Sequence, residues 1–233
     1  MSKKTLFALL VLVLIVLAPY TFLPPLLGSV LASTLQNQLG LESVPEVDLE
    51  SDPAPMMYAG SLSKALVSAE GVKLRGIKVQ KVIMDLDPFN VNLVESATSG
   101  ALSTKQPLSG KLSVELSEEN TSRLAQLVSA VPVQDVELEE DEVVLSMSLG
   151  FGSPTTVRGR LFLQSGSLIF ESQQIEGAPA FAPTEQLLAL TRFEYPVSGL
   201  MYGARVSSVD VRKDRLILSG EIQKIPLGGI PAG

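Results

Sequence analysis

The sequence predicts an α+β fold, in which one or two helices cover one face of a strongly curved antiparallel sheet and an apolar helix precedes the domain. Three observations support this prediction: an uncharged opening segment, several hairpins whose apolar residues alternate along the strands, and two later segments with helical spacing. The chain has 233 residues, which is enough for one domain with a sizeable hydrophobic core. A single main domain is therefore expected.

The opening segment determines where the protein is expected to work. Residues 5–41 contain no charged side chain, and Lys3 and Lys4 directly precede them. An apolar segment behind lysines is exported while the lysines stay on the cytoplasmic side. The sequence therefore predicts that the main domain is extracytoplasmic.

Two fates of this segment are compatible with its composition. The apolar run 5–18 stops at Pro19, which suits a cleavable signal peptide with its cleavage site at 30–32. Apolar character resumes over 22–31, which lengthens the segment beyond the roughly 20 residues that span a bilayer. The sequence favours a single-pass anchor in the cell membrane over a cleaved signal peptide. It disfavours a buried soluble helix, because no polar face is visible before Ser33.

The predicted organisation has four parts. A signal-anchor or signal peptide covers residues 1–32, a helix extension and connector cover 33–56, the main domain covers 57–223, and a tail covers 224–233. Apolar residues at helical spacing carry the opening helix as far as Gly40, and the prolines after it favour an extended connector.

Strands dominate the main domain. Alternating apolar residues predict a strand over 62–69 and one long strand over 72–86, whose change of parity near Lys81 indicates a bulge or twist. Three hairpins follow, with turns expected at Glu139–Glu142, Ser165-Gly166 and Lys213-Asp214.

Two helices are predicted in the main domain. Ser117 is a favourable N-cap for a helix that ends before Pro132. That helix carries one apolar stripe, formed by Leu124, Leu127, Val128 and Val131. A shorter helix is expected over 184–193, within the less regular apolar stretch 178–201. The stripe and the stretch belong either to the core or to the roof of a hydrophobic groove.

Composition excludes several classes of enzyme and partner. The chain contains no histidine and no cysteine, so it has neither imidazole-dependent nucleophiles nor the usual zinc ligands. No catalytic residue, metal or cofactor is predicted, although a hydrolase acting through two carboxylates remains open. The formal net charge of −7 argues against a nucleic-acid partner. The acids Glu139–Glu142 favour a solvated turn over a calcium site.

Several short patterns in the chain resemble the LmeA-like phospholipid-binding family of bacterial envelope proteins. The patterns are Gly60-Ser-Leu62, Gly71-Val72, Leu74-Arg-Gly-Ile77-Lys-Val79, Val157-Arg-Gly159-Arg-Leu161, Gly166-Ser-Leu168 and the closing hairpin over 206–220. The resemblance covers roughly residues 45–222. It implies a fold similar to the tubular lipid-binding (TULIP) superfamily, in which a curved sheet wraps around a helix and leaves an apolar channel.

The resemblance implies a function as well. It implies a membrane-tethered protein that binds phospholipid or another acyl lipid and holds or transfers it for envelope maintenance. The groove is expected between the sheet and the helix that follows Ser117. Apolar periodicity assigns to it Leu124, Leu127, Val128, Val131, Phe181, Leu187, Leu188, Leu190 and Phe193. A structural or scaffold protein that binds an envelope partner through its surface is the alternative. The sequence determines neither the lipid nor the oligomeric state.

Overall fold

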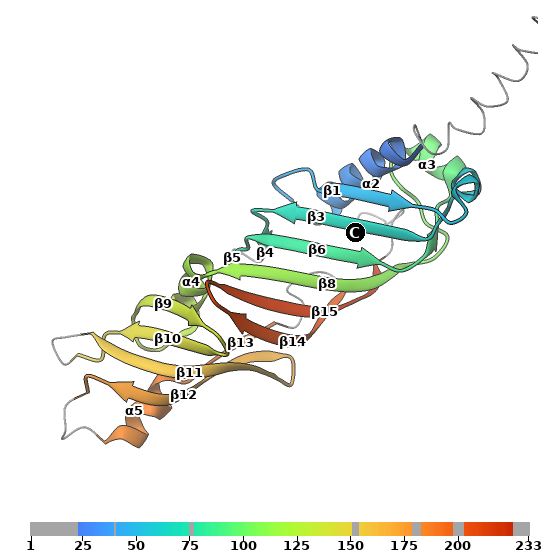
Figure 1. Ribbon diagram of the computed structural model, residues 1–233. Helices are drawn as coiled ribbons and strands as arrows, with labels where there is room; N and C mark the ends of the chain where they lie inside the picture. The colour runs from blue at the N-terminus through green and yellow to red at the C-terminus, as the bar shows by residue number, and fades with distance from the viewer. Residues whose placement is uncertain are drawn as a thin grey trace, which may run out of the picture. The chain divides into compact units, whose positions relative to one another are not determined.

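The computed structural model describes residues 23–39, 41–74, 77–150, 154–178, 183–197 and 203–225. It confirms the α+β class, because mostly antiparallel sheets, one of them curled, are accompanied by a few helices (Figure 1). The chain forms two compact units. Unit 1 comprises Met1–Ala69, Ile83–Lys111 and Ile222–Gly233, and unit 2 comprises Glu70–Val82 and Leu112–Glu221. The apolar run 5–18, where an N-terminal helix is expected, lies outside the described residues.

The strands form two larger and two small sheets. The six-stranded sheet has the order β1 (Glu46–Glu50), β3 (Lys64–Glu70), β6 (Lys81–Leu86), β8 (Leu108–Ser117), β15 (Arg215–Ile225) and β14 (Ala204–Arg212). The five-stranded sheet has the order β13 (Phe193–Pro196), β12 (Ser167–Glu176), β11 (Thr155–Gln164), β10 (Glu142–Met147) and β9 (Val133–Glu139). The small sheets pair β2 (Ser61–Leu62) with β7 (Phe89–Asn90) and β4 (Lys73–Leu74) with β5 (Ile77–Lys78).

Alternation along the strands gives the six-stranded sheet one buried face. Every second residue of β8 from Leu108 to Leu116 is buried, and the residues between them are more exposed. Gly110 permits the backbone of β6 to approach, since a Cβ there would lie 2.3 Å from the Asp85 carbonyl oxygen. This sheet therefore curls at positions where a side chain would not fit.

The three predicted hairpins are confirmed. The first joins β9 to β10 and places Leu138 opposite Val143. The second joins β11 to β12, and the third joins β14 to β15. Each turn contains a residue in the left-handed region: Asp141 (φ 62°), Ser165 (φ 53°) and Asp214 (φ 65°). Two-residue turns of this conformation match the right-handed twist of the strands that they join.

The long strand predicted over 72–86 is wrong. The chain forms β4 and β5, which pair antiparallel with Leu74 opposite Ile77, and only then enters β6. The change of apolar parity near Lys81 marks the passage from β5 to β6, because each strand has its own inward face. The expected bulge is thus a break between two strands.

Helix α2 (Leu23–Leu39) corrects the prediction for the opening segment. The helix continues across the expected boundary at residue 32 and packs against β1. Leu31, Ala32 and Leu35 are at most 3% exposed. No helix of the described part of the chain is long and apolar enough to cross a membrane. Residues 23–39 therefore form one helix of unit 1 with a buried side, and the boundary expected at residue 32 falls inside this helix.

The polar side of α2 is inconspicuous in the sequence for a physical reason. Its exposed residues include Ser29 and Ser33, whose hydroxyls donate to the carbonyl oxygens of Leu26 and Ser29 at 2.8 and 2.7 Å. Small hydroxyl side chains bonded to their own helix replace the charged residues that mark the solvent side of most surface helices. A sequence pattern based on charge therefore misses this side.

The connector expected over 33–56 is more structured than predicted. Its residues Glu46–Glu50 form β1, which pairs antiparallel with β3 and buries Leu49. The short 3-10 helix η1 (Ala54–Ala59) follows. The prolines of the segment lie outside β1, so they interrupt the chain around this strand and leave its ladder intact.

Helices of the main domain agree with the sequence in part. Ser117 caps α4 (Glu118–Val128), accepting from the Asn120 amide at 3.4 Å, and α5 (Thr184–Thr191) occupies the second predicted position. Helix α4 ends earlier than expected, and Phe193 belongs to β13. Helix α3 (Leu93–Ser99) is not predicted by the sequence, because it has only seven residues and shows little apolar periodicity.

Candidate functional site

An apolar crevice lies inside unit 2, between α4, the sheet and β13. Its lining consists of Ile77, Val79, Val114, Leu116, Leu124, Tyr195, Val197 and Leu218. The strands β8 and β15 supply Val114, Leu116 and Leu218 because alternation points these residues toward the buried face. Helix α4 supplies Leu124, which is 4% exposed. Apart from the Tyr195 hydroxyl, the side chains that line the crevice are hydrocarbon.

The crevice is narrow. Its volume of about 10 Å³ corresponds to the space of one water-sized sphere. Water has no polar partners on hydrocarbon walls, so a crevice of this composition favours an apolar occupant. A longer apolar chain fits only if the surrounding side chains or α4 move outward.

A wide pocket adjoins the crevice within unit 2. It has a volume of about 710 Å³, which is within the usual range for small-molecule sites. Its lining consists of Leu163, Ser165, Gly166, Val197, Ala204, Arg205, Val206, Ser207 and Glu221. The hairpin turn between β11 and β12 holds one wall, because the Val197 amide donates to the Gly166 carbonyl oxygen at 3.0 Å. Polar and apolar side chains share this pocket.

Val197 connects the two spaces, since its side chain lines both. It is 1% exposed, and the residue follows directly after β13. On one side of Val197 the lining is almost entirely hydrocarbon, and on the other it includes Arg205 and Ser207. The arrangement provides an apolar space next to a polar one, as a ligand with a hydrocarbon tail and a polar head requires.

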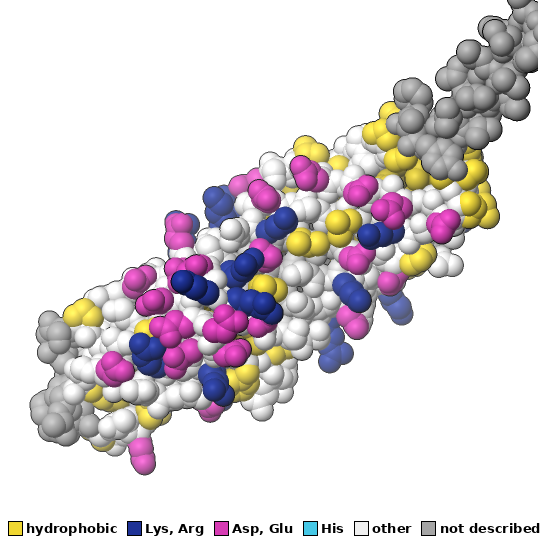
Figure 2. Space-filling view, in the orientation of Figure 1, with side chains coloured by type: hydrophobic (Ala, Val, Ile, Leu, Met, Phe, Trp, Pro, Cys, Tyr) yellow, Lys and Arg dark blue, Asp and Glu magenta, His cyan; other side chains and the backbone are white. Residues whose placement is uncertain are grey.

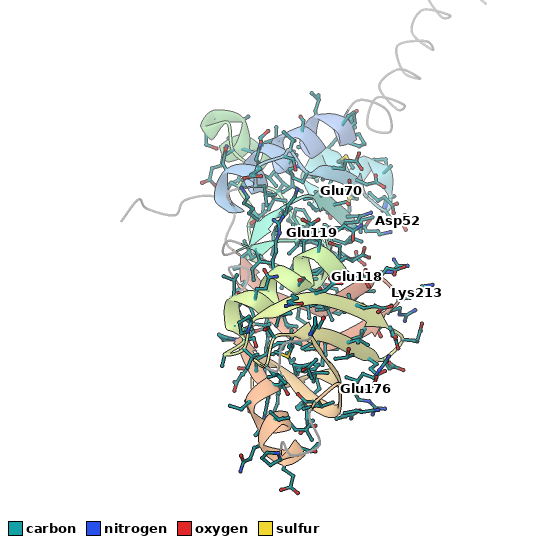
Figure 3. All side chains as sticks on the ribbon, turned by 90° about the vertical axis from the view of Figure 1, so that its left-hand side faces the viewer. Asp52, Glu70, Glu118, Glu119, Glu176 and Lys213 are labelled. Carbon is teal, nitrogen blue, oxygen red and sulfur yellow. The ribbon has the colours of Figure 1, made fainter. Side chains whose placement is uncertain are left out.

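A third pocket, between α4 and β9, is acidic. Glu118, Glu119, Asp135, Glu137 and Asp214 contribute to its lining. Figure 3 shows Glu118 and Glu119 on α4. The Glu118 carboxylate accepts from the Leu138 amide at 2.8 Å, and Glu119 pairs with Arg123 at 2.6 Å. Glu118 attaches α4 to β9, and Glu119 stabilises the first turn of α4. The described residues contain no group of three or more acids that could hold a metal ion.

The acidic turn expected over Glu139–Glu142 is bound to an arginine of the neighbouring strand. Arg158 on β11 donates to Glu139 and Glu142 at 3.2 Å each and lies 3.7 Å from Glu176. The hydrogen bond to Glu142 raises the pKa of the Arg158 guanidinium. This cluster joins four neighbouring strands, β9, β10, β11 and β12.

The predicted site residues are dispersed in the structure. Leu124 alone lines the crevice. On α4 and after it, Leu127 is 70% exposed, whereas Val128 and Val131 are half-buried. Of the α5 residues, Leu187 is buried, Leu188 is half-buried and Leu190 is 55% exposed. Phe193 is buried and stacks on Phe170 with ring centroids 5.0 Å apart. Phe181 lies outside the described residues.

Most residues that line the crevice and the wide pocket come from strands that the sequence predicts but to which it assigns no site. The inward residues of β8 and β15 are indistinguishable from core residues by alternation, because core and crevice share one face of the sheet. Arg205 gives no signal of its own, since it is an exposed residue of a strand that also contains Ser207, Asp210 and Arg212. The sequence does not show that this strand lines a pocket.

The described residues therefore form mostly antiparallel sheets with a few helices, and unit 2 has an apolar crevice beside a wider pocket. The chain belongs to the LmeA-like phospholipid-binding family, whose model matches residues 20–221. The match begins before α2 and ends at residue 221, so it includes all of unit 2 and most of unit 1. No curated protein matches the chain, and no solved structure matches it.

Proposed function

We propose that this protein binds a phospholipid or a similar acyl lipid in unit 2, and that it holds or transfers this lipid. The family supports lipid binding. The observation that carries the proposal is the position of Val197, which lines an apolar crevice on one side and a pocket with Arg205 on the other. A lipid tail would occupy the crevice and its head the wide pocket.

Chemistry of the two spaces supports this orientation. Burial of an acyl chain contributes about 0.8 kcal/mol per methylene group, so a hydrocarbon crevice provides affinity without a charged site. Arg205 presents a guanidinium, which matches the geometry of phosphate oxygens. Arg205 takes part in none of the ion pairs formed among the described residues. A phosphate therefore does not have to displace an ion-pair partner among those residues.

The proposal requires an opening of the crevice, which accommodates one water-sized sphere in the structure. Helix α4 is the wall suited to move, since it is a single helix of eleven residues with an exposed Leu127 at its end. Strands β8 and β15 lie inside the six-stranded sheet, where hydrogen bonds on both sides hold them.

The experiment is extraction of lipid from the purified chain, followed by mass spectrometry. Leu218→Phe places a larger ring in the crevice, and Leu216→Phe makes the same change two residues earlier on the same face of β15, outside the crevice. Both variants overpack the unit by a similar amount, about 1–3 kcal/mol. We expect bound phospholipid to be lost in Leu218→Phe and retained in Leu216→Phe. Equal amounts in both variants would contradict the proposal.

The narrow crevice favours a second candidate, a structural or scaffold protein with a filled interior. For such a protein, the wild-type chain takes up no fluorescent phospholipid, and neither phenylalanine variant changes any lipid content. Uptake that Leu218→Phe abolishes would exclude this candidate.

We extend the proposal to a membrane-tethered, extracytoplasmic protein that contributes to envelope maintenance. Support comes from the uncharged residues 5–41 behind Lys3 and Lys4. Protease digestion of intact cells tests it. We expect the protease to digest unit 2 outside the cytoplasm, while the N-terminal lysines remain in the membrane fraction. Protection of unit 2 in intact and in outer-membrane-permeabilised cells would contradict the proposal.

A further inference from the structure

Unit 1 has exposed apolar side chains on three neighbouring elements. Leu26 on α2 is 62% exposed, Met56 and Tyr58 on η1 are 50% and 48% exposed, and Val94 on α3 is 76% exposed. We call these four residues the apolar tip. Figure 2 shows hydrophobic side chains gathered over the part of unit 1 where Figure 1 places α2, α3 and the segment before β2. Large apolar residues that gather in one place on a surface mark an interaction site.

Backbone contacts hold the three elements together. The pairing of β2 with β7 brings η1, which precedes β2, next to α3, which follows β7. The Val91 amide donates to the Gly60 carbonyl oxygen at 2.7 Å. Gly60, at φ 80°, leaves no room for a Cβ, which would lie 2.3 Å from the Val91 carbonyl oxygen. The loop after α3 attaches to α2, because the Leu102 amide donates to the Thr34 hydroxyl at 3.0 Å.

Few charges lie near the apolar tip in the sequence. Segments 23–41, 53–63 and 88–94 contain no charged residue, although the chain has 43 residues of Asp, Glu, Lys and Arg, and the exposed Glu95 directly follows Val94 on α3. The nearest acid of α3, Glu95, accepts hydrogen bonds from Asn92 and Ser103 at 2.9 and 2.8 Å. Transfer of the tip to an apolar environment therefore leaves few charges or polar groups without partners.

The hydroxyl groups beside the tip are also satisfied within their helices. Those of Ser29 and Ser33 donate to carbonyl oxygens of α2. On α3, the Thr98 hydroxyl lies 3.1 Å from the Val94 carbonyl oxygen and 3.0 Å from that of Glu95. Such intrahelical bonds lower the cost of removing serine and threonine from water.

We propose that the apolar tip docks unit 1 onto the surface of a lipid bilayer. The chain outside the described residues selects this occupant, because the uncharged run 5–18 ends only a few residues before α2 and its Leu26. A run of this composition partitions into lipid, and that brings the start of α2 to the bilayer surface. Tyr58 adds an aromatic ring with a polar end, which is suited to the interface. This docking rests on the proposed membrane tether, but it does not depend on lipid binding in unit 2.

The charge pattern specifies the kind of bilayer contact. The segments of the tip contain no lysine or arginine, so docking depends on apolar burial and not on attraction to anionic lipid. Contact with vesicles of neutral phosphatidylcholine is therefore expected, and it is expected to persist at high salt.

The experiment uses the full chain, which contains no cysteine, so single cysteines can be labelled without background. An environment-sensitive dye is placed at Val94→Cys and Met56→Cys, with Leu127→Cys and Val44→Cys as controls. The control residues are also large, apolar and exposed. Leu127 belongs to unit 2, and Val44 lies before the start of β1, whereas η1 with its tip residues follows the end of β1. Each protein is reconstituted into phosphatidylcholine vesicles and exposed to a water-soluble quencher.

We expect quenching to be lost at residues 94 and 56 and retained at both control positions, at low and at high salt. Quenching at residue 94 equal to that at residue 127 would overturn the proposal. So would protection that disappears on dilution into excess vesicles, because this result indicates a second copy as the occupant. Protection that requires a cell extract overturns it as well, since the occupant is then a protein. A Leu26→Gln and Met56→Gln double variant should restore quenching at residue 94, with an unchanged unfolding midpoint.

Discussion

Each unit has a distinct group of apolar side chains, which is exposed in unit 1 and buried in unit 2. In unit 1 the apolar residues of the tip point outward, and the polar groups beside them are bonded internally. In unit 2 the apolar residues line an internal crevice, and polar groups gather in the pocket next to it. The first arrangement suits an extended apolar surface such as a bilayer, and the second suits a single molecule with an apolar tail.

The difference teaches that apolar content alone does not distinguish a docking surface from a binding site. What distinguishes them is the position of the polar groups. A surface that leaves water needs its polar atoms already satisfied, whereas a site for a headgroup needs polar atoms that remain able to bind. Arg205 beside the crevice and the back-bonded serines of α2 show these two requirements within one chain.

The largest expected effect comes from removing the aromatic support of unit 2. Phe170 is fully buried and stacks on Phe193, which belongs to the strand that precedes Val197. Phe170→Ala is expected to lower the free energy of unfolding by about 3–5 kcal/mol, because it leaves a cavity. Denaturant unfolding measures this loss. A decrease below about 1 kcal/mol would show that the five-stranded sheet does not depend on the stack.

Substitution of two leucines on α2 distinguishes a core position from a position on the docking surface. Leu31 is fully buried, and Leu26, little more than one turn earlier, is 62% exposed. Leu31→Ala is expected to cost about 2–5 kcal/mol of unfolding free energy, whereas Leu26→Ala should leave it nearly unchanged. Thermal unfolding measures both variants. Similar small effects would mean that α2 is not part of the folded domain, and that the sequence-based anchor boundary at residue 32 describes the protein better.

Replacement of the pocket arginine tests the polar side of the comparison. Arg205→Gln removes the guanidinium and is expected to weaken binding of a phosphate-containing lipid about tenfold, with little effect on diacylglycerol. Arg160→Gln, an exposed arginine that does not line the pocket, serves as the control. Lipid titration measures both. Equal losses for the two lipids would indicate that Arg205 supports the fold and not the headgroup.

The smallest effect is expected at the arginine cluster of unit 2. Arg158→Gln removes the ion pairs to Glu139, Glu142 and Glu176. Because the groups are partly exposed, the unfolding midpoint should fall only slightly, and the difference should shrink as salt is added. The raised pKa of Arg158 means that its charge persists throughout the neutral range, so no pH step is expected there. A step near neutral pH would contradict this.

Much of the secondary structure was accessible from the sequence, because local rules decide it. Ser117 as an N-cap and the hairpin turns at Asp141, Ser165 and Asp214 follow from side-chain and backbone preferences of a few residues. The break within 72–86 was missed, since a change of parity is compatible with a bulge and with a reversal. The predicted site residues stay a prediction: Leu124 lines the crevice, whereas Leu127, on the same predicted apolar stripe, faces solvent.

The sequence by itself determined the fold class, the hairpins, the family and the absence of imidazole and thiol chemistry. These properties depend on composition and on short-range patterns, which the chain carries directly. Only the tertiary structure decided that one side of α2 is buried in unit 1, that Val197 joins a crevice to a pocket, and that residues from three separate segments form one apolar tip. Those facts depend on which strands pair and which faces meet, and such long-range contacts leave no local trace in the sequence.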